Sequence, residues 1–553
     1  MHRILILGGY GTFGSRIVRL LAQRKSWALV VAGRSKEKAE ALARSLGDEQ
    51  ISAIALDRDA VDADTVRGLN LWLVIDASGP FQGEKALEYP VVRAALEAGV
   101  HYIDIADALS FVREIGRFDA QAKARGLTVI SGASSVPTLS SAVIAELATG
   151  LDALLEIEIA ISSSNQATLG RSVHAALLSY AGKPIRLRRY GTWRDIAGLQ
   201  DWQSVDIIVP GHAPLRGRLV APCEVPDLDL LPARYPSLRK AIFRAGTELA
   251  LLNRGAGLLA RLVSLRIMRS LSPLADLASR TFGLLQRFGT SRSGMVVTVT
   301  GRKGEDWQRR RWNVLAEDGD GLWVPALAAA VLTEKLDRDA LAPGARPGID
   351  VLSLAEFRTA FAPFKIEDAT ETETAGPSPF RQWLGAAVTE LPPAIHAMHD
   401  DPLERSASGT VTVTRGTHPV AALMCRLLGF PASGENLPLR VEFEPRGSGE
   451  IWRRIFTSST FASHLKPWPG RSGAMRECVG PLAYGFRLDT DAQGLHMVFE
   501  RWWLFGIPLP RALGPQVKAA QWQDGEDYGF SVDVFGIGIG RVIGYRGLLR
   551  LTA

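Results

Sequence analysis

Cysteine is scarce in this chain, which has Cys223, Cys425 and Cys478 as its three cysteines in 553 residues. They lie far apart without C-x-x-C spacing, so neither a disulfide framework nor a cysteine-based zinc site is indicated. The nine histidines form no H-E-x-x-H set. His396 and His399 are three residues apart on an expected helix, but they lack a third ligand and we expect both at the surface. We therefore predict no metal site and a reducing compartment.

Signatures of other enzyme classes are also missing. The chain has neither a P-loop lysine motif nor a G-x-S-x-G nucleophile turn, which argues against a P-loop phosphate site and an α/β-hydrolase. An apolar run begins at Ile4, which leaves no room for the charged and apolar regions of a signal peptide. We expect a cytoplasmic protein.

The composition is that of a globular protein, with 46% hydrophobic and 22% charged residues. The length predicts about two to four structural units. The net charge of +6 is unevenly distributed, because residues 171–311 hold 24 Lys and Arg against 10 Asp and Glu. Nucleic acid is one partner for such a region, but no nucleic-acid-binding module accompanies it, and we predict no nucleic-acid partner.

A glycine-rich loop lies near the N-terminus between an expected strand, Ile4–Leu7, and a stretch with apolar residues at helical spacing. The glycines fit G-x-G-x-x-G and also G-x-x-G-x-x-G, both typical of a loop that holds a pyrophosphate. An ordinary turn is the alternative, since glycines punctuate turns as well. The predicted cofactor-binding residues of the loop are Gly8, Gly9, Tyr10, Gly11, Thr12, Phe13 and Gly14.

The next apolar run, Ala28–Ala32, ends at a basic position. Arg34 and Ser35 stand about 20 residues past the glycine loop, where an NAD-binding chain places Asp or Glu on the ribose 2′-hydroxyl. Arg34 suits a forked contact with a 2′-phosphate, and Ser35 suits donation to it. A solvated arginine at a strand end is the alternative. We predict NADP as the cofactor.

Two further strands lead to candidate cofactor contacts. The run Ile51–Leu56 leads to Asp57, and Trp72–Asp76 leads to Ser78, Gly79 and Pro80. Ligands of a doubly wound parallel sheet bind beyond the carboxyl ends of its strands. We therefore predict Asp57 on the adenine side and the Ser-Gly-Pro turn on the nicotinamide ribose side, although a plain turn explains Gly-Pro equally well.

Five stretches, taken in order, resemble the saccharopine dehydrogenase-like NADP-binding family. They read GGYGTFG, AGRS, DASGPF, HYIDIAD (His101 to Asp107) and SGASSVPTLSS (Ser131 to Ser141). The resemblance implies an α/β Rossmann domain with a doubly wound parallel sheet, interrupted by an inserted α+β domain, after which the chain returns to the Rossmann domain. It implies reductase chemistry with NADP without naming the substrate.

One departure from the family concerns the strand that begins at Tyr102. Relatives usually carry Gly-Glu shortly after its aspartate, whereas this chain continues from Asp104 to Asp107 with Ile-Ala between them. Either Asp107 replaces the missing glutamate, or the reaction differs, or the site is inactive. The catalytic residues stay unknown, with Tyr102, Asp104 and Asp107 as candidates.

Changes of pattern divide the rest of the chain. The predicted parts are a Rossmann domain at 1–150, an inserted α+β substrate domain at 151–315, a return segment at 316–366, a linker at 367–379 and a mostly-β domain at 380–553. The linker prediction rests on an acidic, Thr-rich and Pro-terminated stretch with nothing to bury. His174 and Tyr180, on the first helix of the inserted domain, are candidate donors to a substrate, although a lone histidine on a helix is more often packed or solvated.

Residues 237–290 form a basic apolar stretch that we expect to be helical. Its nine Lys and Arg stand against Glu248 and Asp276, and no run approaches the 18 apolar residues that a membrane span needs. Apolar faces flanked by Arg254, Arg261, Arg266 and Arg269 suit helices that lie in a membrane interface. A packed helical subdomain or a homodimer interface is the alternative. The sequence leaves open both a peripheral contact with the inner membrane and a homodimer.

The C-terminal part resembles an uncharacterised bacterial domain, DUF4166, at 451–456, 476–481 and 506–510. Short alternating runs such as 409–414 predict mostly β structure. Trp502, Trp503 and Phe505 either line a concave face for an apolar ligand or belong to the core, and we favour the core.

These patterns together predict an NADP-dependent oxidoreductase that transfers a hydride to a C=O, C=N or C=C bond of a small or lipid-like substrate. The alternative is a non-catalytic NADP-binding or lipid-handling module that is peripherally associated with the membrane.

Overall fold

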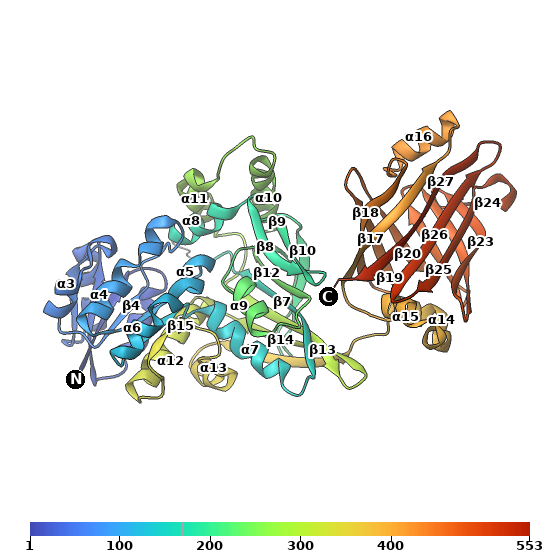
Figure 1. Cartoon of the computed structure of the whole chain (residues 1–553). Coiled ribbons are helices and arrows are strands. Elements are labelled where there is room, and N and C mark those ends of the chain that lie inside the picture. Colours follow the sequence, from blue (N-terminus) through green and yellow to red (C-terminus); the bar gives the residue numbers. More distant parts are fainter. Residues whose placement is uncertain (168–170, 553) are drawn as a thin grey trace. The chain divides into compact units, whose positions relative to one another are not determined.

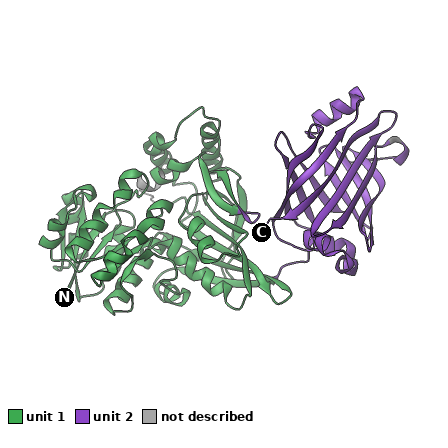
Figure 2. Cartoon of the chain, viewed as in Figure 1, with its two compact units in different colours: residues 1–188, 193–373 green, residues 189–192, 374–553 purple. Residues whose placement is uncertain are grey.

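The computed structural model describes the backbone of residues 1–167 and 171–552, and the side chains of these residues apart from 171–174 and 513. The chain forms two compact units, which Figure 2 shows in different colours. Unit 1 comprises residues 1–188 and 193–373, and unit 2 comprises residues 189–192 and 374–553.

Unit 1 begins with a seven-stranded sheet in the order β15-β6-β5-β4-β1-β2-β3. Its strands are β1 (His2–Leu7), β2 (Trp27–Gly33), β3 (Ile51–Ala55), β4 (Leu73–Asp76), β5 (His101–Asp104), β6 (Thr128–Ser131) and β15 (Gly344–Pro347). Neighbouring strands are parallel throughout, so the loops that follow them meet at one edge. The order reverses between β1 and β4, which is where doubly wound sheets bind ligands. The predicted Rossmann fold is confirmed.

Helices cover both faces of this sheet because its strands are apolar on both sides. Ile4 and Ile6 of β1 belong to one hydrophobic cluster, whereas Leu5 and Leu7 belong to another, as period-two alternation requires. The helices are α1 (Gly14–Leu21), α2 (Lys36–Leu46), α3 (Ala63–Gly68), α4 (Pro90–Ala98), α5 (Leu109–Glu114), α6 (Asp119–Ala124), α7 (Ser140–Ala148), α12 (Val324–Asp337) and α13 (Leu354–Phe361).

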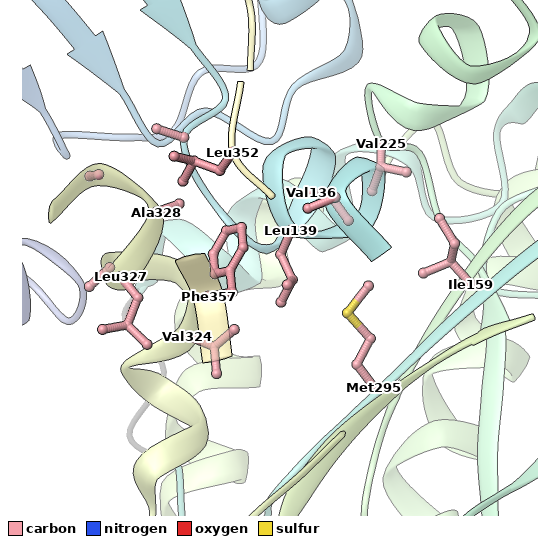
Figure 3. Close-up of a cluster of buried hydrophobic side chains, with 14 of the residues drawn as sticks. Val136, Leu139, Ile159, Val225, Met295, Val324, Leu327, Ala328, Leu352 and Phe357 are labelled. Carbon is pink, nitrogen blue, oxygen red and sulfur yellow. The ribbon is translucent and has the colours of Figure 1, made fainter. Parts of the chain in front are cut away.

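The chain returns to the first sheet after the insertion, as the family resemblance implies. Strand β15 pairs with β6, and α12 and α13 pack beside it. Figure 3 shows Val324, Leu327 and Phe357 of these helices near Leu139, which precedes α7, and Met295 of the inserted sheet. All five belong to one hydrophobic cluster. The inserted elements and the Rossmann elements therefore share a core, which fixes their arrangement within unit 1.

The inserted domain is built on a nine-stranded mixed sheet with the main order β10-β11-β12-β7-β13-β14-β16, to which the hairpin β8-β9 is added beside β12. The strands are β7 (Ala153–Ser163), β8 (Pro184–Arg189), β9 (Thr192–Ala197), β10 (Gln203–Ile207), β11 (Leu215–Pro222), β12 (Lys240–Thr247), β13 (Ser293–Lys303), β14 (Asp306–Ala316) and β16 (Ile366–Thr374). The helices are α8 (Arg171–Tyr180), α9 (Asp227–Arg234), α10 (Ala250–Ser264) and α11 (Ala275–Leu285). The predicted α+β insertion is confirmed.

Two predictions within unit 1 are wrong. Residues 240–247 form strand β12, so the stretch 237–290 is helical only from residue 250 onward. The acidic residues 367–374 belong to strand β16 and are not a linker. Both segments pair with neighbours that are distant in sequence: β12 with β7, and β16 with β14. Tertiary pairing thus overrode what the local composition indicated.

Strand β16 has few apolar residues because it lies at the edge of the sheet, where one side faces solvent. Its acidic side chains meet basic and polar groups of neighbouring elements. Asp368 accepts a hydrogen bond from the indole N–H of the buried Trp312 at 2.7 Å and pairs with Arg358 at 2.8 Å. Glu371 lies 3.5 Å from Arg311 of β14. Charge complementarity therefore replaces apolar burial along this strand.

Unit 2 is a closed antiparallel barrel in the strand order β22-β21-β20-β19-β18-β17-β27-β26-β25-β23, which the pairing of β22 with β23 closes, while β24 is added outside the ring. Its strands are β17 (Arg405–Arg415), β18 (Gly434–Arg446), β19 (Gly449–Phe456), β20 (Thr460–Pro467), β21 (Ala474–Val479), β22 (Leu482–Asp491), β23 (Gly494–Leu504), β24 (Ile507–Leu509), β25 (Gln516–Asp524), β26 (Asp527–Gly536) and β27 (Gly540–Leu551). Its helices are α14 (Pro379–Leu384), α15 (Pro393–His399) and α16 (Pro419–Leu427). The mostly-β prediction is confirmed.

The core of unit 2 contains a histidine that we expected at the surface. His399 is fully buried, and its ring stacks on Phe380 with 3.9 Å between ring centroids. Its Nε2 lies 2.7 Å from Gln521 Oε1, and burial lowers the pKa of His399 to about 3, which keeps the ring neutral. The prediction also fails for Phe505, which is 79% exposed, whereas its neighbours Trp502 and Trp503 are buried as expected.

Candidate functional site

The glycine loop between β1 and α1 needs its glycines for different steric reasons. Gly8 has a φ of +68°, and a Cβ there would lie 2.6 Å from the carbonyl oxygen of Ala77. Cβ atoms on Gly9 and Gly14 would overlap the carbonyl oxygens of Ile6 and Gly8, respectively. A Cβ on Gly11 would touch Gly8 at 3.0 Å and otherwise point into open space. Gly11 is therefore the position whose side chain would enter the space of a bound pyrophosphate.

Tyr10 connects this loop to the end of β2. Its hydroxyl accepts a hydrogen bond from the backbone N–H of Ser35 at 2.9 Å. Its ring covers Gly33 so closely that a Cβ there would collide with it. The Ala-Gly-Arg-Ser segment thus needs its glycine to admit Tyr10, and the two predicted cofactor loops form one continuous surface.

Arg34 extends from this surface into solvent. Its side chain is exposed and makes no hydrogen bond or ion pair with any residue that the structure describes. Ser35 caps α2, because its hydroxyl accepts from the N–H of Lys38 at 3.3 Å and donates to Glu37 at 2.8 Å. The hydroxyl of Ser35 is therefore engaged by the helix, and its donation to a phosphate stays a prediction. The N-terminus of α2 adds a favourable dipole for an anion beside Arg34.

A cleft of about 550 Å³ opens beside the glycine loop. One wall contains Tyr10, Gly11 and Thr12, and segment 318–323 contributes to another. This volume lies within the range of known cofactor pockets. All of the lining residues belong to unit 1. The cleft is therefore the natural place for the pyrophosphate and nearby ribose.

Arg16, on the first turn of α1, is a candidate that the sequence analysis missed. It lines this cleft, and its guanidinium lies 5.5 Å from the ring centroid of Trp323. Burial and the nearby Arg19 lower the pKa of Arg16, and its buried Nε has no hydrogen-bond partner among the described residues. A cation at a helix N-terminus beside a glycine loop suits a diphosphate. In the sequence, Arg16 stands two residues after the last glycine of the loop, but there it looks like any polar residue of an amphipathic helix.

The loop after β4 is held by a buried carboxylate. Asp76 accepts hydrogen bonds from both the N–H and the hydroxyl of Ser78, with 2.9 Å to the nitrogen. Arg58, also missed from the sequence, lies 3.4 Å from Asp76 and donates to the carbonyl of Pro80 at 3.1 Å. Asp57 caps the short helix η1 (Arg58–Ala60) by accepting from the N–H of Asp59. The predicted residues of this loop thus lie at one edge, but their polar groups are partly used to shape it.

Two of the three catalytic candidates are buried too deeply to meet a substrate. Tyr102 and Asp104 are both fully buried. One oxygen of Asp104 accepts from Ser131 and from the N–H groups of Ala106 and Gly132, at 2.9–3.0 Å. Burial raises the pKa of Asp104 to about 7 despite these bonds. Asp104 therefore joins the ends of β5 and β6 and has a structural role.

Asp107 is the candidate that remains accessible. Its side chain is exposed, and it accepts a hydrogen bond from Gln82 Nε2 at 3.0 Å. Desolvation by neighbouring atoms raises the pKa of its carboxyl although the side chain as a whole is exposed, and desolvation also raises the pKa of Glu224, to which the charge of Asp107 adds. The hydroxyl of Tyr180, at the end of α8, lies beside Cys223 and within the field of both carboxylates. The side chain of His174 lies outside the described residues.

Asp107, Glu224 and Tyr180 thus combine groups of the Rossmann and inserted domains beyond the carboxyl end of β5. A raised pKa favours the protonated form of an acid, which is the form that a proton donor needs. Among the residues that the structure describes, no three His, Cys, Asp or Glu gather as a metal site.

Comparisons with known proteins agree with this geometry. The family model of the saccharopine dehydrogenase NADP binding domain matches residues 4–130, and that of a domain of unknown function, DUF4166, matches residues 391–549. No curated protein matches the chain. The first match supports a nicotinamide cofactor at the sheet edge, and the second carries no activity.

Two solved structures illustrate the likeness to known proteins. Saccharopine dehydrogenase (L-Glu forming) from Saccharomyces cerevisiae is 14% identical, with 67% of this chain and 100% of that chain covered and a TM-score of 0.47. GenD2 from gentamicin A biosynthesis, in complex with NAD, is 13% identical over 55% of this chain and 70% of that chain, with a TM-score of 0.27.

The resemblance found in the sequence is confirmed for both segments. Residues 4–130 match the saccharopine dehydrogenase NADP binding domain model, and residues 391–549 match the DUF4166 model, where the sequence had suggested them.

Proposed function

We propose that this protein is an NADP-dependent oxidoreductase that exchanges a hydride with a C=O, C=N or C=C bond of a small or lipid-like substrate. The choice of NADP rather than NAD rests on the position of Arg34. It stands without a partner among the described residues, at the end of β2, where an acidic residue would select NAD. Its guanidinium and the N-terminus of α2 together suit the 2′-phosphate.

The residues at the sheet edge fit such a cofactor along its length. The open space at Gly11 and the unpartnered Nε of Arg16 suit the pyrophosphate. The Ser78 turn, shaped by Asp76, suits the nicotinamide ribose. When bound, NADP supplies the hydride, and the protein supplies position and a proton.

We assign the role of proton donor to Asp107. It is accessible, its pKa is raised by the surrounding protein, and Gln82 orients it. Tyr180 and Glu224 lie close enough to influence it electrostatically. A carboxylic acid in this environment can give a proton to a substrate oxygen, nitrogen or carbon as the hydride arrives.

The cofactor assignment is tested by titrating the full chain with NADPH and with NADH. Arg34→Asp should weaken NADPH about 10-fold to 100-fold, because charge-assisted hydrogen bonds contribute about 1.5–3 kcal/mol. Arg44→Asp, which makes the same charge change at the other end of α2, should leave the preference for NADPH unchanged. Equal affinity of the unaltered protein for both cofactors would contradict the assignment.

The catalytic assignment needs a separate measurement. NADPH oxidation should be followed with carbonyl, imine and enoyl compounds, and transfer of deuterium from labelled NADPH should identify the acceptor. Asp107→Asn should lower kcat by about 10²-fold or more with little change in NADPH affinity. Tight NADPH binding without transfer to any of these classes would favour the non-catalytic module instead.

A further inference from the structure

Exposed apolar side chains are concentrated on α10, α11 and the loop between them. Among the described residues, eight of the large hydrophobic side chains that face solvent lie in this segment, and Leu251 and Leu284 are more than 70% exposed. The set is Leu251, Leu258, Leu259, Leu265, Ile267, Leu277, Leu284 and Phe288. Figure 1 shows both helices at one edge of unit 1, near α8. A soluble monomer rarely exposes such a patch without a function.

The rotation of α10 is fixed by polar contacts at both ends. Near its start, the amide of the buried Asn253 donates to the carbonyls of Leu219 and Thr247 and accepts from the N–H and hydroxyl of Thr247. At its end, Ser264 donates to the carbonyl of Gly182 at 2.8 Å. Between them, Ala260 and Val263 are buried. The opposite, apolar face is therefore held outward.

Glu248 holds together the two ends of the segment that contains α10 and α11. Glu248 precedes α10 and accepts from the N–H and hydroxyl of Thr290, which follows α11, at 2.7 and 2.9 Å. It also pairs with Arg218 at 3.2 Å. Asn165 donates to the carbonyls of Leu285 and Phe288 at the end of α11. The segment thus projects from unit 1 as an anchored element.

The outward faces carry a repeated pattern of leucine and arginine. Leu251 and Leu258 are seven residues apart on α10, and each is followed three residues later by an arginine, Arg254 or Arg261. On α11 the pair is Leu277 with Arg280, and Leu284 near its end is followed by Arg287 in the turn after the helix. Residues three and seven apart share a helix face. Each helix therefore presents an apolar stripe bordered by a stripe of arginine.

The charge of the segment indicates which kind of partner binds its apolar face. Residues 250–290 contain six arginines and one aspartate. Arg254, Arg261, Arg266, Arg269 and Arg280 make no ion pair with any described residue. In a symmetric dimer through this face, the arginine stripes of two copies would oppose each other, which disfavours a second copy. An anionic lipid surface accepts the leucines and attracts the arginines.

We propose that α10 and α11 dock unit 1 on a membrane surface that contains anionic lipid. Their apolar stripes enter the boundary between headgroups and acyl chains, and the arginines contact phosphates. No helix among the described residues is long and apolar enough to cross a membrane, so the contact is interfacial. This inference is independent of the cofactor and of the reaction.

The test is co-sedimentation of the full chain with two kinds of vesicle, phosphatidylcholine alone and phosphatidylcholine with phosphatidylglycerol. Binding to the anionic vesicles is expected at about 0.1 M salt and should be largely lost at about 1 M, where the Debye length falls to about 3 Å. The triple variant Arg254→Gln, Arg261→Gln, Arg280→Gln should weaken binding by about 100-fold, since each basic residue contributes roughly a factor of five.

A matched pair of leucine variants assigns the binding to this surface. Leu258→Gln with Leu284→Gln should abolish vesicle binding, and circular dichroism should show an unchanged fold because both side chains are exposed. Leu423→Gln with Leu427→Gln alters two comparably exposed leucines on α16 and should bind as the unaltered protein does.

Three results would overturn the proposal. The first is absence of binding to anionic vesicles at low salt. The second is an equal loss of binding in the α16 variant. The third is a concentration-dependent dimer, seen by sedimentation velocity, that the Leu258 and Leu284 variant dissociates while vesicles have no effect.

Discussion

The sheet edge of unit 1 and the barrel of unit 2 treat polar side chains in opposite ways. In the barrel, Arg405 and Glu450 are both buried and lie 2.8 Å apart, and Arg405 also donates to backbone carbonyls. At the sheet edge, Arg34 follows β2 and Asp107 follows β5, and both are exposed. The difference indicates that the buried charges of unit 2 serve its fold, whereas the exposed charges of unit 1 are free to meet a ligand under the proposed function.

Glycines show the same contrast. Gly485 and Gly529 of the barrel lie against the rings of Trp468 and Trp522, so each makes room for a tryptophan that packs on the barrel wall. Gly11 of unit 1 faces open space instead. A side chain should therefore disturb the fold in unit 2 and ligand binding in unit 1.

The largest expected effect is on cofactor binding. Gly11→Val should weaken NADPH by about 10³-fold or more while unit 1 stays folded, because the added side chain points away from the packed loop. Gly68→Val, at the end of α3 with free space around it, is the matched control and should bind normally. Calorimetric titration measures both. Unchanged binding in a folded Gly11→Val protein would reduce the loop to an ordinary turn.

Breaking the buried pair of unit 2 should have the opposite outcome. Glu450→Ala leaves Arg405 charged inside the barrel and should destabilise unit 2 by about 3–5 kcal/mol. Scanning calorimetry should show one transition moved to lower temperature, with NADPH affinity retained. Arg471→Ala removes an exposed ion pair with Glu500 and should change stability by less than about 1 kcal/mol. A loss of NADPH binding in Glu450→Ala would show that the units are coupled.

A buried carboxylate in unit 1 predicts a pH dependence of stability. Burial raises the pKa of Asp104 from about 4 to about 7. The folded state then binds a proton that the unfolded state lacks between these values, so the free energy of unfolding should fall as pH rises through this window. Across the whole window this carboxyl changes the free energy of unfolding by about 4 kcal/mol, because each pKa unit corresponds to about 1.36 kcal/mol. Asp227, whose pKa burial also raises to about 7, adds a similar slope.

Asp104→Asn should remove about half of that slope, as measured by urea unfolding across the window. Glu37→Gln is the control, because this carboxylate is exposed on α2. A slope that Asp104→Asn leaves unchanged would show that Asp104 ionises normally despite its burial.

The sequence predicted unit 1 well where function and local pattern coincide. For the loop at Gly8 to Gly14, three local signals predict the same motif: the strand before it, the glycines that its backbone requires and the helix after it. Arg16 and Arg58 were missed because an arginine at a helix start or strand end has no distinctive pattern. His399 was misplaced because its burial depends on Phe380 and Gln521, which approach it only in the folded barrel.

Strand β16 is the clearest case in which composition misled. Segment 367–379 looked like a linker because it has little to bury, yet residues 367–374 complete an edge of the inserted sheet. An edge strand needs only one packed face and a partner of matching charge. Arg311 of β14 and the indole of Trp312 supply that partner, and neither is visible from the acidic segment alone.

The smallest predicted effect tests this account of β16. Asp368→Ala leaves the buried indole N–H of Trp312 without its acceptor and should lower stability by about 1–3 kcal/mol. Glu373→Ala, at the exposed end of the same strand, should change stability by less than about 0.5 kcal/mol. Hydrogen exchange should show faster exchange along β16 in the first variant alone.

In the unaltered protein, limited proteolysis should cut within 375–378 before it cuts within 367–374, because the latter amides belong to a sheet. Early cleavage within 367–374 would show that the strand is open in solution, and the linker interpretation would then be right for this segment.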